Sequence, residues 1–159
     1  MISLSDVHGT FISIIDHGLL ITGAHGCGKS ELALGLVDRG HQLVADDSPI
    51  MMEQNGRLLG RSPKSYKGCL HIHGTGILNI SRLYGAQAIK DEATVELCIH
   101  LTRESFAYID DELLHGKWGE TIIHKIAVPT LTLPSSTTRN LPLLVEAAVR
   151  QRLDIHSCC

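Results

Sequence analysis

The stretch Gly23-Ala24-His25-Gly26-Cys27-Gly28-Lys29-Ser30 decides the fold of this 159-residue chain. It matches the pattern G-x-x-x-x-G-K-[ST] of phosphate-binding loops without a gap. Its three glycines allow left-handed backbone turns, so the loop's N–H groups can approach a polyphosphate. Lys29 would reach the β- and γ-phosphates, and the Ser30 hydroxyl would hold Mg²⁺. The predicted nucleotide-binding residues are therefore Gly23, Ala24, His25, Gly26, Cys27, Gly28, Lys29 and Ser30.

The segments on either side of this loop support the prediction. Residues 18–22 are apolar enough for a short buried strand, and residues 30–39 have the pattern of a helix. A chance glycine-rich turn before a helix is the alternative, but strand, loop and helix come in the required order. Bound phosphates would then lie at a helix N-terminus. Residues 10–15 predict a further strand, which forms a hairpin with residues 18–22.

An acidic pair follows one helix later, where residues 42–45 predict a strand that ends in Asp46 and Asp47. Ligands of α/β sheets bind outside the carboxyl ends of strands, so these carboxylates should face the phosphate loop. One of these carboxylates could hold Mg²⁺ through water, and the other could accept a proton from an attacking hydroxyl. The alternative is that Asp-Asp-Ser-Pro only forms a turn.

The rest of the chain predicts an α/β fold: a mixed sheet of P-loop kinase type, flanked by helices and carrying antiparallel hairpins, in one domain over residues 1–159. Asn55-Gly56 joins two strands in a hairpin, and residues 95–101 form a core strand. Pro129 places residues 127–133 at a sheet edge or strand end. Residues 102–125 have no clear pattern, and the tail 156–159 is predicted to be disordered. A last helix is capped by Asn140, with an apolar face of Leu143, Leu144, Ala147 and Ala148.

Composition excludes several classes of partner. With a net charge of -3 and a pI near 6.3, the chain has no excess of positive charge with which to bind nucleic acid or an anionic membrane. We expect a cytoplasmic protein, because no apolar run is long enough to span a membrane and the N-terminus lacks a leader pattern. The five cysteines form no C-x-x-C pair, which favours free thiols.

Five further positions are open to two interpretations. His8 precedes the first strand and could approach the phosphates, although an exposed histidine is the simpler interpretation. Arg139 precedes the last helix, where it could contact a phosphate or a surface carboxylate. Cys69, His71 and His73 share one face of a predicted strand and could bind a transition metal, but a plain strand face is favoured.

Several segments together resemble one family, the catalytic domain of bacterial HPr kinase/phosphorylase. They are Ser30-Glu31-Leu32-Ala33-Leu34, Arg39-Gly40-His41, Leu43-Val44-Ala45-Asp46-Asp47, Gly74-Thr75-Gly76-Ile77 with Asn79, and Arg139-Asn140 followed by Glu146-Ala147-Ala148. The resemblance implies an enzyme that moves phosphate to and from a serine of the phosphocarrier protein HPr, with ATP or pyrophosphate and Mg²⁺. It also implies a homo-oligomer, a hexamer in this family, and a short form without the additional N-terminal domain that many members carry.

The resemblance also assigns roles to matching positions. Asp47 matches the general base for phosphorylation, which acts as the acid in phosphorolysis. His8 matches a catalytic histidine followed by glycine. Lys29 and Ser30 match the phosphate-loop lysine and the magnesium ligand. With Asp47 as the base, Asp46 is expected to position Mg²⁺ together with Ser30. The loop that ends at Arg139 matches the segment associated with the reverse reaction.

The chain departs from the family pattern at two places. The family's Glu-x-Arg-Gly is His71-Ile72-His73-Gly74 here, and no arginine lies in residues 109–113, where the family carries another catalytic one. Arginines of this kind can contribute about a thousandfold to phosphoryl transfer. Two alternatives therefore stay open: a nucleotide-binding regulatory module with weakened catalysis, and a P-loop kinase for another acceptor. A GTPase is disfavoured because an Asn-Lys-x-Asp motif is missing.

Overall fold

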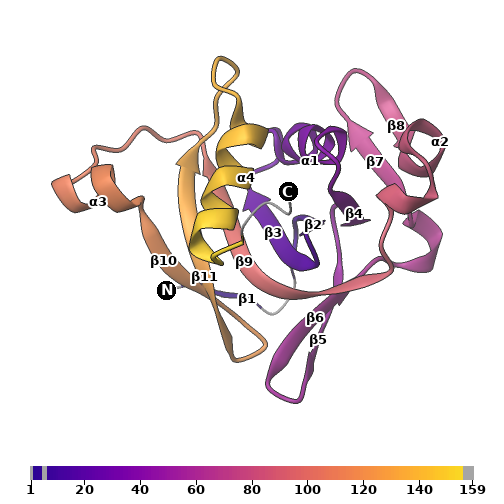
Figure 1. Ribbon diagram of the computed structural model, residues 1–159, viewed down its shortest axis with the longest axis horizontal. Helices are drawn as coiled ribbons and strands as arrows, with labels where there is room; N and C mark the ends of the chain where they lie inside the picture. Colours follow the sequence, from indigo (N-terminus) through magenta and orange to yellow (C-terminus); the bar gives the residue numbers. More distant parts are fainter. Residues whose placement is uncertain (1, 5–6, 156–159) are drawn as a thin grey trace.

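A mixed sheet forms the centre of the computed structural model, which describes residues 2–4 and 7–155 (Figure 1). In the described residues the sheet has nine strands, seven of which follow one path. That path is β1 (Ile2–Leu4), β10 (Trp118–Ile123), β11 (Ile126–Pro134), β9 (Glu92–Thr102), β3 (His17–Gly23), β2 (Thr10–Ile14) and β4 (Gln42–Ala45). The hairpin of β5 (Ile50–Gln54) and β6 (Arg57–Arg61) joins through β6 to the start of β9. The predicted tail 156–159 lies outside the described residues.

Strand direction places several loops at one edge of the sheet. β9 runs parallel to both β3 and β11, and β2 runs antiparallel to both β3 and β4. The carboxyl ends of β3, β4, β9 and β11 therefore lie at the same edge, together with the start of β2. This is the edge at which α/β sheets bind their ligands.

Two helices cover one face of the sheet, where α1 (Lys29–Asp38) and α4 (Leu141–Arg152) lie against each other (Figure 1). Gly35 permits this approach, because a Cβ there would lie 2.2 Å from Cγ of Pro142. The apolar cluster on this face joins both helices to β2, β3 and β9. The cluster on the other face comes mainly from strands, through residues such as Phe11, Leu20 and Cys98. The predicted α/β class is confirmed.

A smaller unit packs beside α1 (Figure 1). It contains the two-stranded sheet of β7 (Cys69–Ile72) and β8 (Gly76–Asn79), followed by α2 (Ile80–Tyr84) and the 3₁₀ turn η2 (Ala86–Ala88). Another 3₁₀ turn, η1 (Lys64–Tyr66), precedes it. Leu70, Ile72 and Ile80 of this unit belong to the same core cluster as α1, so β7 has a fixed position beside the phosphate loop.

Both predicted hairpins are confirmed. β2 and β3 are joined by Ile15 and Asp16 with φ of 49° and 65°, and β5 and β6 by Asn55 and Gly56 with φ of 54° and 77°. Two consecutive residues with positive φ match the right-handed twist of a hairpin. The predicted core strand at residues 95–101 is also confirmed, as part of the longer β9.

The predicted apolar face of the last helix is wrong except at Ala148, which is half-buried against the core, although the helix begins after Asn140 as expected. Leu143 and Leu144 are 43% and 37% exposed, and Ala147 is exposed too. The buried side is formed by Leu141, Val145, Glu146 and Val149. An apolar sequence pattern places a glutamate on the exposed side of a helix. Glu146 is buried instead, because Arg39 and His41 bind its carboxylate.

The prediction for Pro129 holds only in part. β11 lies inside the sheet between β10 and β9, so it is not an edge strand. Pro129 pairs with Glu120 of β10, while the pairing with β9 begins one residue later, at Thr130. The residue without an N–H therefore precedes the part of β11 that is paired on both sides.

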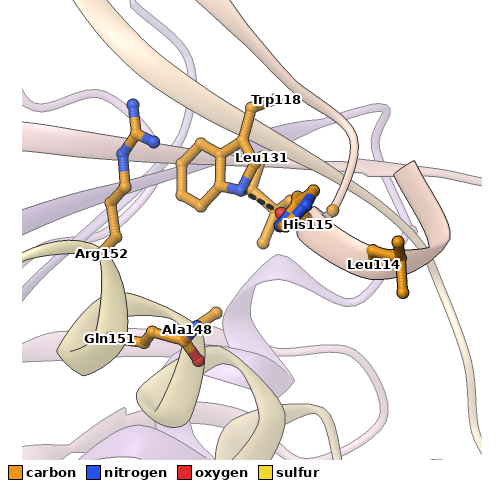
Figure 2. A pocket seen from close by; sticks show the side chains of 8 residues that line it. Leu114, His115, Trp118, Leu131, Ala148, Gln151 and Arg152 are labelled. Carbon is orange, nitrogen blue, oxygen red and sulfur yellow. Dashed lines mark hydrogen bonds between the residues drawn. The ribbon is translucent and has the colours of Figure 1, made fainter. Parts of the chain in front are cut away.

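Residues 102–125, which had no clear pattern, include β10 and the short helix α3 (Asp110–His115). α3 stands away from the sheet, and no residue of it is buried (Figure 1). A cavity of about 620 Å³ lies between α3, β10 and the end of α4. Trp118 lies on its wall: the indole Nε1 donates to the carbonyl of His115 at 3.0 Å, and Cζ of Arg152 lies 4.6 Å from the ring centroid (Figure 2).

None of the described helices is both long enough and apolar enough to cross a membrane. The cysteines within the described residues, Cys27, Cys69 and Cys98, are free. Cys98 is buried between Thr22 and the pair Thr121 and Thr130, and burial raises the pKa of its thiol despite these hydroxyls.

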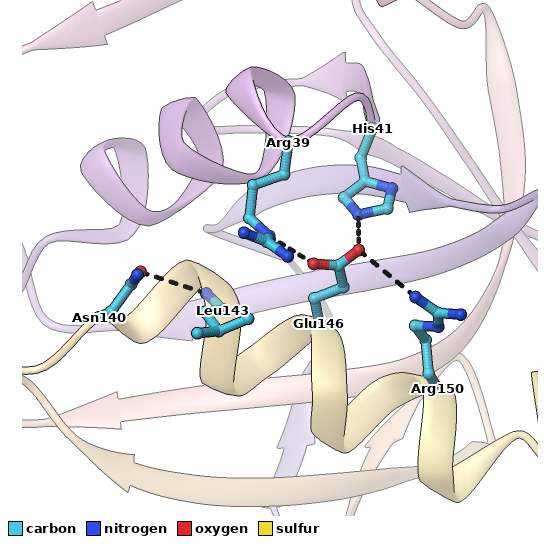
Figure 3. A network of polar contacts seen from close by, with 6 residues as sticks. All are labelled: Arg39, His41, Asn140, Leu143, Glu146 and Arg150. Atoms are coloured by element: carbon cyan, nitrogen blue, oxygen red, sulfur yellow. Dashed lines mark hydrogen bonds and ion pairs between the residues drawn. The ribbon is translucent and has the colours of Figure 1, made fainter. Parts of the chain in front are cut away.

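An ionic network centred on the buried Glu146 connects the end of α1 to α4 (Figure 3). The Glu146 carboxylate accepts a short hydrogen bond from Nε of Arg39, and Nε2 of His41 donates to it at 3.0 Å. Nη1 of Arg150 is 3.9 Å away. Burial opposes ionisation of Glu146, but the hydrogen bonds from Arg39 and His41 outweigh it and hold the carboxyl pKa below its ordinary value of 4.5.

This network predicts a pH dependence of stability. Because the folded pKa of Glu146 is lowered, its contribution is fully present above pH 4.5 and is lost as pH falls below the folded pKa. Glu146→Gln should lower the free energy of unfolding at pH 7 by about 2 kcal/mol, since Arg39 and His41 lose a charged acceptor. The difference from wild type should shrink below pH 4.5 in urea denaturation curves. Glu104→Gln, at an exposed position, is the control and should not change the free energy of unfolding. If the difference between Glu146→Gln and wild type stayed constant from pH 7 to pH 3, the lowered pKa of Glu146 would be contradicted.

Candidate active site

The phosphate loop connects β3 to α1 in the predicted conformation. Gly23, Gly26 and Gly28 have φ of 145°, 78° and 95°, all of which other residues rarely adopt. Gly28 is the N-cap of α1, which begins at Lys29. Nζ of Lys29 folds back over the loop and donates to the carbonyls of Gly23 at 2.9 Å and Ala24 at 3.1 Å. The loop and its lysine therefore form one hydrogen-bonded unit at the N-terminus of a ten-residue helix.

Asp46 connects this loop to three other segments. Its Oδ1 accepts from Oγ1 of Thr10 at 2.8 Å, Oγ of Ser30 at 3.2 Å and the amide of Asp47 at 3.0 Å. Its Oδ2 accepts from the amide of His71 at 2.9 Å. β2, α1, β4 and β7 thus meet at one carboxylate, which lies beside the predicted magnesium ligand Ser30.

Asp47 lies at the exposed end of the same turn with φ of 67°, a left-handed conformation that aspartate tolerates better than most residues. The turn is held by its backbone, because the amide of Gly9 donates to the Asp47 carbonyl at 2.7 Å and the amide of Ser48 to the Asp46 carbonyl at 2.9 Å. A strained residue that its neighbours hold in place is typical of functional sites. Asp47 is one of the residues that line an open cavity.

That cavity has a volume of about 240 Å³ and joins the loop to the acidic pair. Besides Lys29, Ser30, Asp46 and Asp47, its walls include Thr10, His25, Gly26, Gly28, Glu31, His71 and His73. Both Asp46 and Ser30 present oxygen atoms, the ligand type that Mg²⁺ prefers, and Mg²⁺ commonly takes only one or two protein ligands beside phosphates and water. Among the described residues no group of three or more His, Cys, Asp or Glu could hold a metal. These two oxygen donors fit a magnesium ion whose other ligands come from a bound phosphate and water.

The two other predicted catalytic residues flank this cavity. Nδ1 of His8 lies 3.5 Å from Oγ of Ser48, directly after the acidic pair. Arg139 lines a separate cavity of about 570 Å³ on the other side of the loop, which shares Gly26, Gly28 and Glu31 with the first. The fold therefore places His8 near Asp47, and Arg139 across the phosphate loop from it.

The predicted strand face of Cys69, His71 and His73 is divided by the structure. β7 ends at Ile72, so His73 lies in the turn that follows. His71 and His73 are exposed and line the cavity, while Cys69 is half-buried and is not among its lining residues. The two histidines face the phosphate loop rather than forming a site with Cys69.

Two residues of the site, Thr10 and Arg103, were not predicted from the sequence. Thr10 is fully buried, yet its hydroxyl donates to Asp46, and the place of its strand between β3 and β4 could not be known before the fold. Arg103 donates to the carbonyls of Gly26 at 2.6 Å and His25 at 3.4 Å. It directly follows β9, and the pairing of β9 with β3 could not be known before the fold.

Comparisons with known proteins agree with this geometry. Residues 1–158 match the family described as HPr Serine kinase C-terminal domain. HPr kinase/phosphorylase from Xanthomonas campestris pv. campestris and from Xanthomonas oryzae pv. oryzae are each 41% identical to the chain over 147 residues, which are 91% of this chain and 46% of the relative. The chain spans about half the length of these curated relatives.

A solved structure is similar over nearly the whole chain. The structure of the Hpr(Ser) kinase/phosphatase from Coxiella burnetii superposes with a TM-score of 0.87 at 38% sequence identity, covering 96% of this chain and 93% of that one. The two chains thus share the overall fold.

The hydrogen bond between Thr10 and Asp46 provides a test of the site's internal organisation. Thr10→Val keeps the side-chain shape but removes a fully buried donor to a carboxylate. We expect the free energy of unfolding to fall by about 1.5 kcal/mol in urea denaturation, because such bonds to a charged group contribute about 1.5–3 kcal/mol. Thr132→Val, at a half-buried position of β11, is the matched control. Equal effects of the two substitutions would contradict a special role for Thr10.

Proposed function

This chain belongs to the family of HPr serine kinase C-terminal domains, and on that premise we propose that it is an ATP- or pyrophosphate-dependent protein serine kinase/phosphorylase that acts on the phosphocarrier protein HPr. The observation that carries the proposal is the cavity that joins the phosphate loop to the pair Asp46 and Asp47. We further propose that residues 1–159 act as one P-loop domain within a cytoplasmic homo-oligomer, a hexamer as the family resemblance implies.

In this proposal the loop from Gly23 to Ser30 binds the phosphates of the nucleotide. Its backbone amides and the positive end of α1 attract phosphate oxygens. Lys29 exchanges the carbonyls of Gly23 and Ala24 for the β- and γ-phosphates. Ser30 and Asp46 would hold Mg²⁺, which when bound neutralises charge on the phosphate oxygens.

Asp47 is the proposed general base. Its exposed carboxylate accepts the proton of the acceptor's seryl hydroxyl while the seryl oxygen bonds to the γ-phosphorus and the bond to the β-phosphate oxygen breaks, so that ADP leaves. In the reverse reaction an oxygen of inorganic phosphate bonds to the phosphorus of phosphoserine. The serine oxygen leaves and recovers the proton from Asp47, so the products are pyrophosphate and free HPr.

His8 and Arg139 complete the proposed catalytic set. His8 lies beside Ser48 on the Asp47 side of the loop, where it can contact the acceptor's serine or its phosphate. Arg139 lies across the loop with Ser135, Ser136 and Thr137 in a polar wall, where it can stabilise a phosphate that enters from that side.

Asp47→Asn tests the assigned base. Loss of the proton acceptor should lower the rate of HPr phosphorylation at least 100-fold, the lower range of general-base contributions. Binding of Mg²⁺-ATP should stay within about threefold of wild type, because Asp47 lies at the exposed end of its turn. The rate would be measured with γ-labelled ATP and HPr, and the labelled residue located by mass spectrometry.

Glu104→Gln, an exposed carboxylate after β9, is the control for this experiment and should change neither quantity. Serine phosphorylation at the wild-type rate by the Asp47 variant would show that the base is wrong. A wild-type protein that binds Mg²⁺-ATP but labels no HPr would instead favour one of the two alternatives, a regulatory module or a kinase for another acceptor.

One observation favours the regulatory module. His71 and His73 line the cavity at the positions where the family resemblance implies a glutamate and an arginine. A carboxylate that supports metal binding and a permanent cation are thereby replaced by two imidazoles, which reduces the charge available for phosphoryl transfer.

The double substitution His71→Glu and His73→Arg tests this alternative. If the histidines limit turnover, the double variant should transfer phosphate to HPr at least tenfold faster than wild type, because a fixed cation is restored beside the phosphates. The measurement is the initial rate with saturating ATP. The control is the double substitution Glu53→His and Arg57→His on the distant β5–β6 hairpin. It exchanges the same residue types in the opposite direction and should not change the rate. An unchanged or lower rate in the double variant would contradict the limiting role of the histidines.

A further inference from the structure

Four consecutive carbonyls of the phosphate loop are held by two cationic side chains. Lys29 donates to Gly23 and Ala24, at 2.9 and 3.1 Å. Arg103 donates to the next two, with Nη2 lying 3.4 Å from the carbonyl oxygen of His25 and 2.6 Å from that of Gly26. The two cations therefore divide the loop between them.

The sheet brings Arg103 to this position. β9 and β3 are parallel neighbours in which Leu101 pairs with Gly23, so the chain leaves β9 beside the point where the loop begins. The guanidinium then lies against the loop: a Cβ added at Gly26 would be 2.6 Å from Nη2 of Arg103. The absence of a side chain at Gly26 thus leaves room for the arginine as well as permitting the φ of 78°.

Peptide geometry turns this contact into a constraint on the loop. In a planar trans peptide the C=O and the following N–H point in opposite directions. Holding the His25 carbonyl toward Arg103 therefore turns the amide of Gly26 away from it. The amide of Cys27 is already bonded to the carbonyl of Ala24 at 3.2 Å, which closes the turn on the other side.

The two cations have different tasks once a phosphate binds. Lys29 has to leave its carbonyls to reach the β- and γ-phosphates. Arg103 can keep both of its carbonyls, because both accept from Nη2, and this nitrogen carries two N–H groups at a fixed angle in the planar guanidinium. The loop would then keep its shape at the moment when Lys29 no longer supports it.

We propose that Arg103 is a positioning residue that holds the phosphate loop in its anion-binding conformation while Lys29 moves onto the bound phosphate. This inference rests on the proposed nucleotide-binding function. Arg103 lies outside residues 109–113, where the family resemblance implies an arginine, and it contacts the loop from the end of β9.

The test measures binding of Mg²⁺-ATP and of pyrophosphate with Mg²⁺ by titration calorimetry at fixed ionic strength. Arg103→Met keeps the aliphatic stem but removes the donors, and should weaken both ligands about tenfold, the effect of losing one hydrogen bond of a charged group. Arg103→Lys should recover part of this loss, since one ammonium replaces the guanidinium fork. Arg57→Met, on the exposed β5–β6 hairpin, is the matched control and should bind both ligands as wild type does.

Steady-state kinetics separate positioning from direct catalysis. A residue that only shapes the binding loop acts equally on substrate and transition state, so Arg103→Met should raise KM for ATP about tenfold and leave kcat within about twofold. Wild-type affinities in Arg103→Met, or a lower kcat with unchanged KM, would overturn the inference. Failure of the wild-type protein itself to bind either ligand would overturn the proposed function, an outcome distinct from an unaffected Arg103 variant. Thermal unfolding without ligand, compared with Arg57→Met, verifies that the variants are folded.

Discussion

The carboxylate of Asp46 is the contact on which the site depends. It accepts hydrogen bonds from the hydroxyls of Thr10 and Ser30 and from the amides of Asp47 and His71. These donors come from four segments that lie far apart in the sequence. Hydrogen bonds to an ionised acceptor are stronger than neutral ones, and a donor left without its acceptor would carry a desolvation cost. One charge therefore sets the mutual positions of the phosphate loop, the acidic pair and the β7–β8 unit before any ligand binds.

Helix α1 is held at both ends by carboxylates. At its first turn Ser30 donates to Asp46, and just beyond its last turn Arg39 and His41 donate to Glu146 of α4. The same helix packs through Gly35 against the first turn of α4. Because Arg139 directly precedes Asn140, the N-cap of α4, the cavity on that side of the loop has a fixed wall. The Glu146 network is thus distant from the phosphates but belongs to the frame that positions them.

The charges around the phosphate loop differ from those that the family resemblance implies. His71 and His73 line the cavity where a glutamate and an arginine are implied, and the exposed helix α3 occupies the region of the other implied arginine. Arg103 approaches the loop from the end of β9 instead. Positive charge near the phosphates supports phosphoryl transfer, and here Lys29 and Arg103 are the cationic side chains that contact the loop.

The sequence by itself determined the local elements and the kind of chemistry. The glycine pattern with Lys29 and Ser30 predicted the loop, and turn residues such as Asn55-Gly56 predicted the hairpins, because these depend on the backbone preferences of a few adjacent residues. The fold class and the family followed from the same motifs. Only the tertiary structure decided which side of α4 is buried, how Pro129 is accommodated in β11, and that Thr10 and Arg103 belong to the site. Those features depend on partners distant in the chain: Glu146 can be buried only beside Arg39 and His41, and Arg103 meets Gly26 only because β9 pairs with β3.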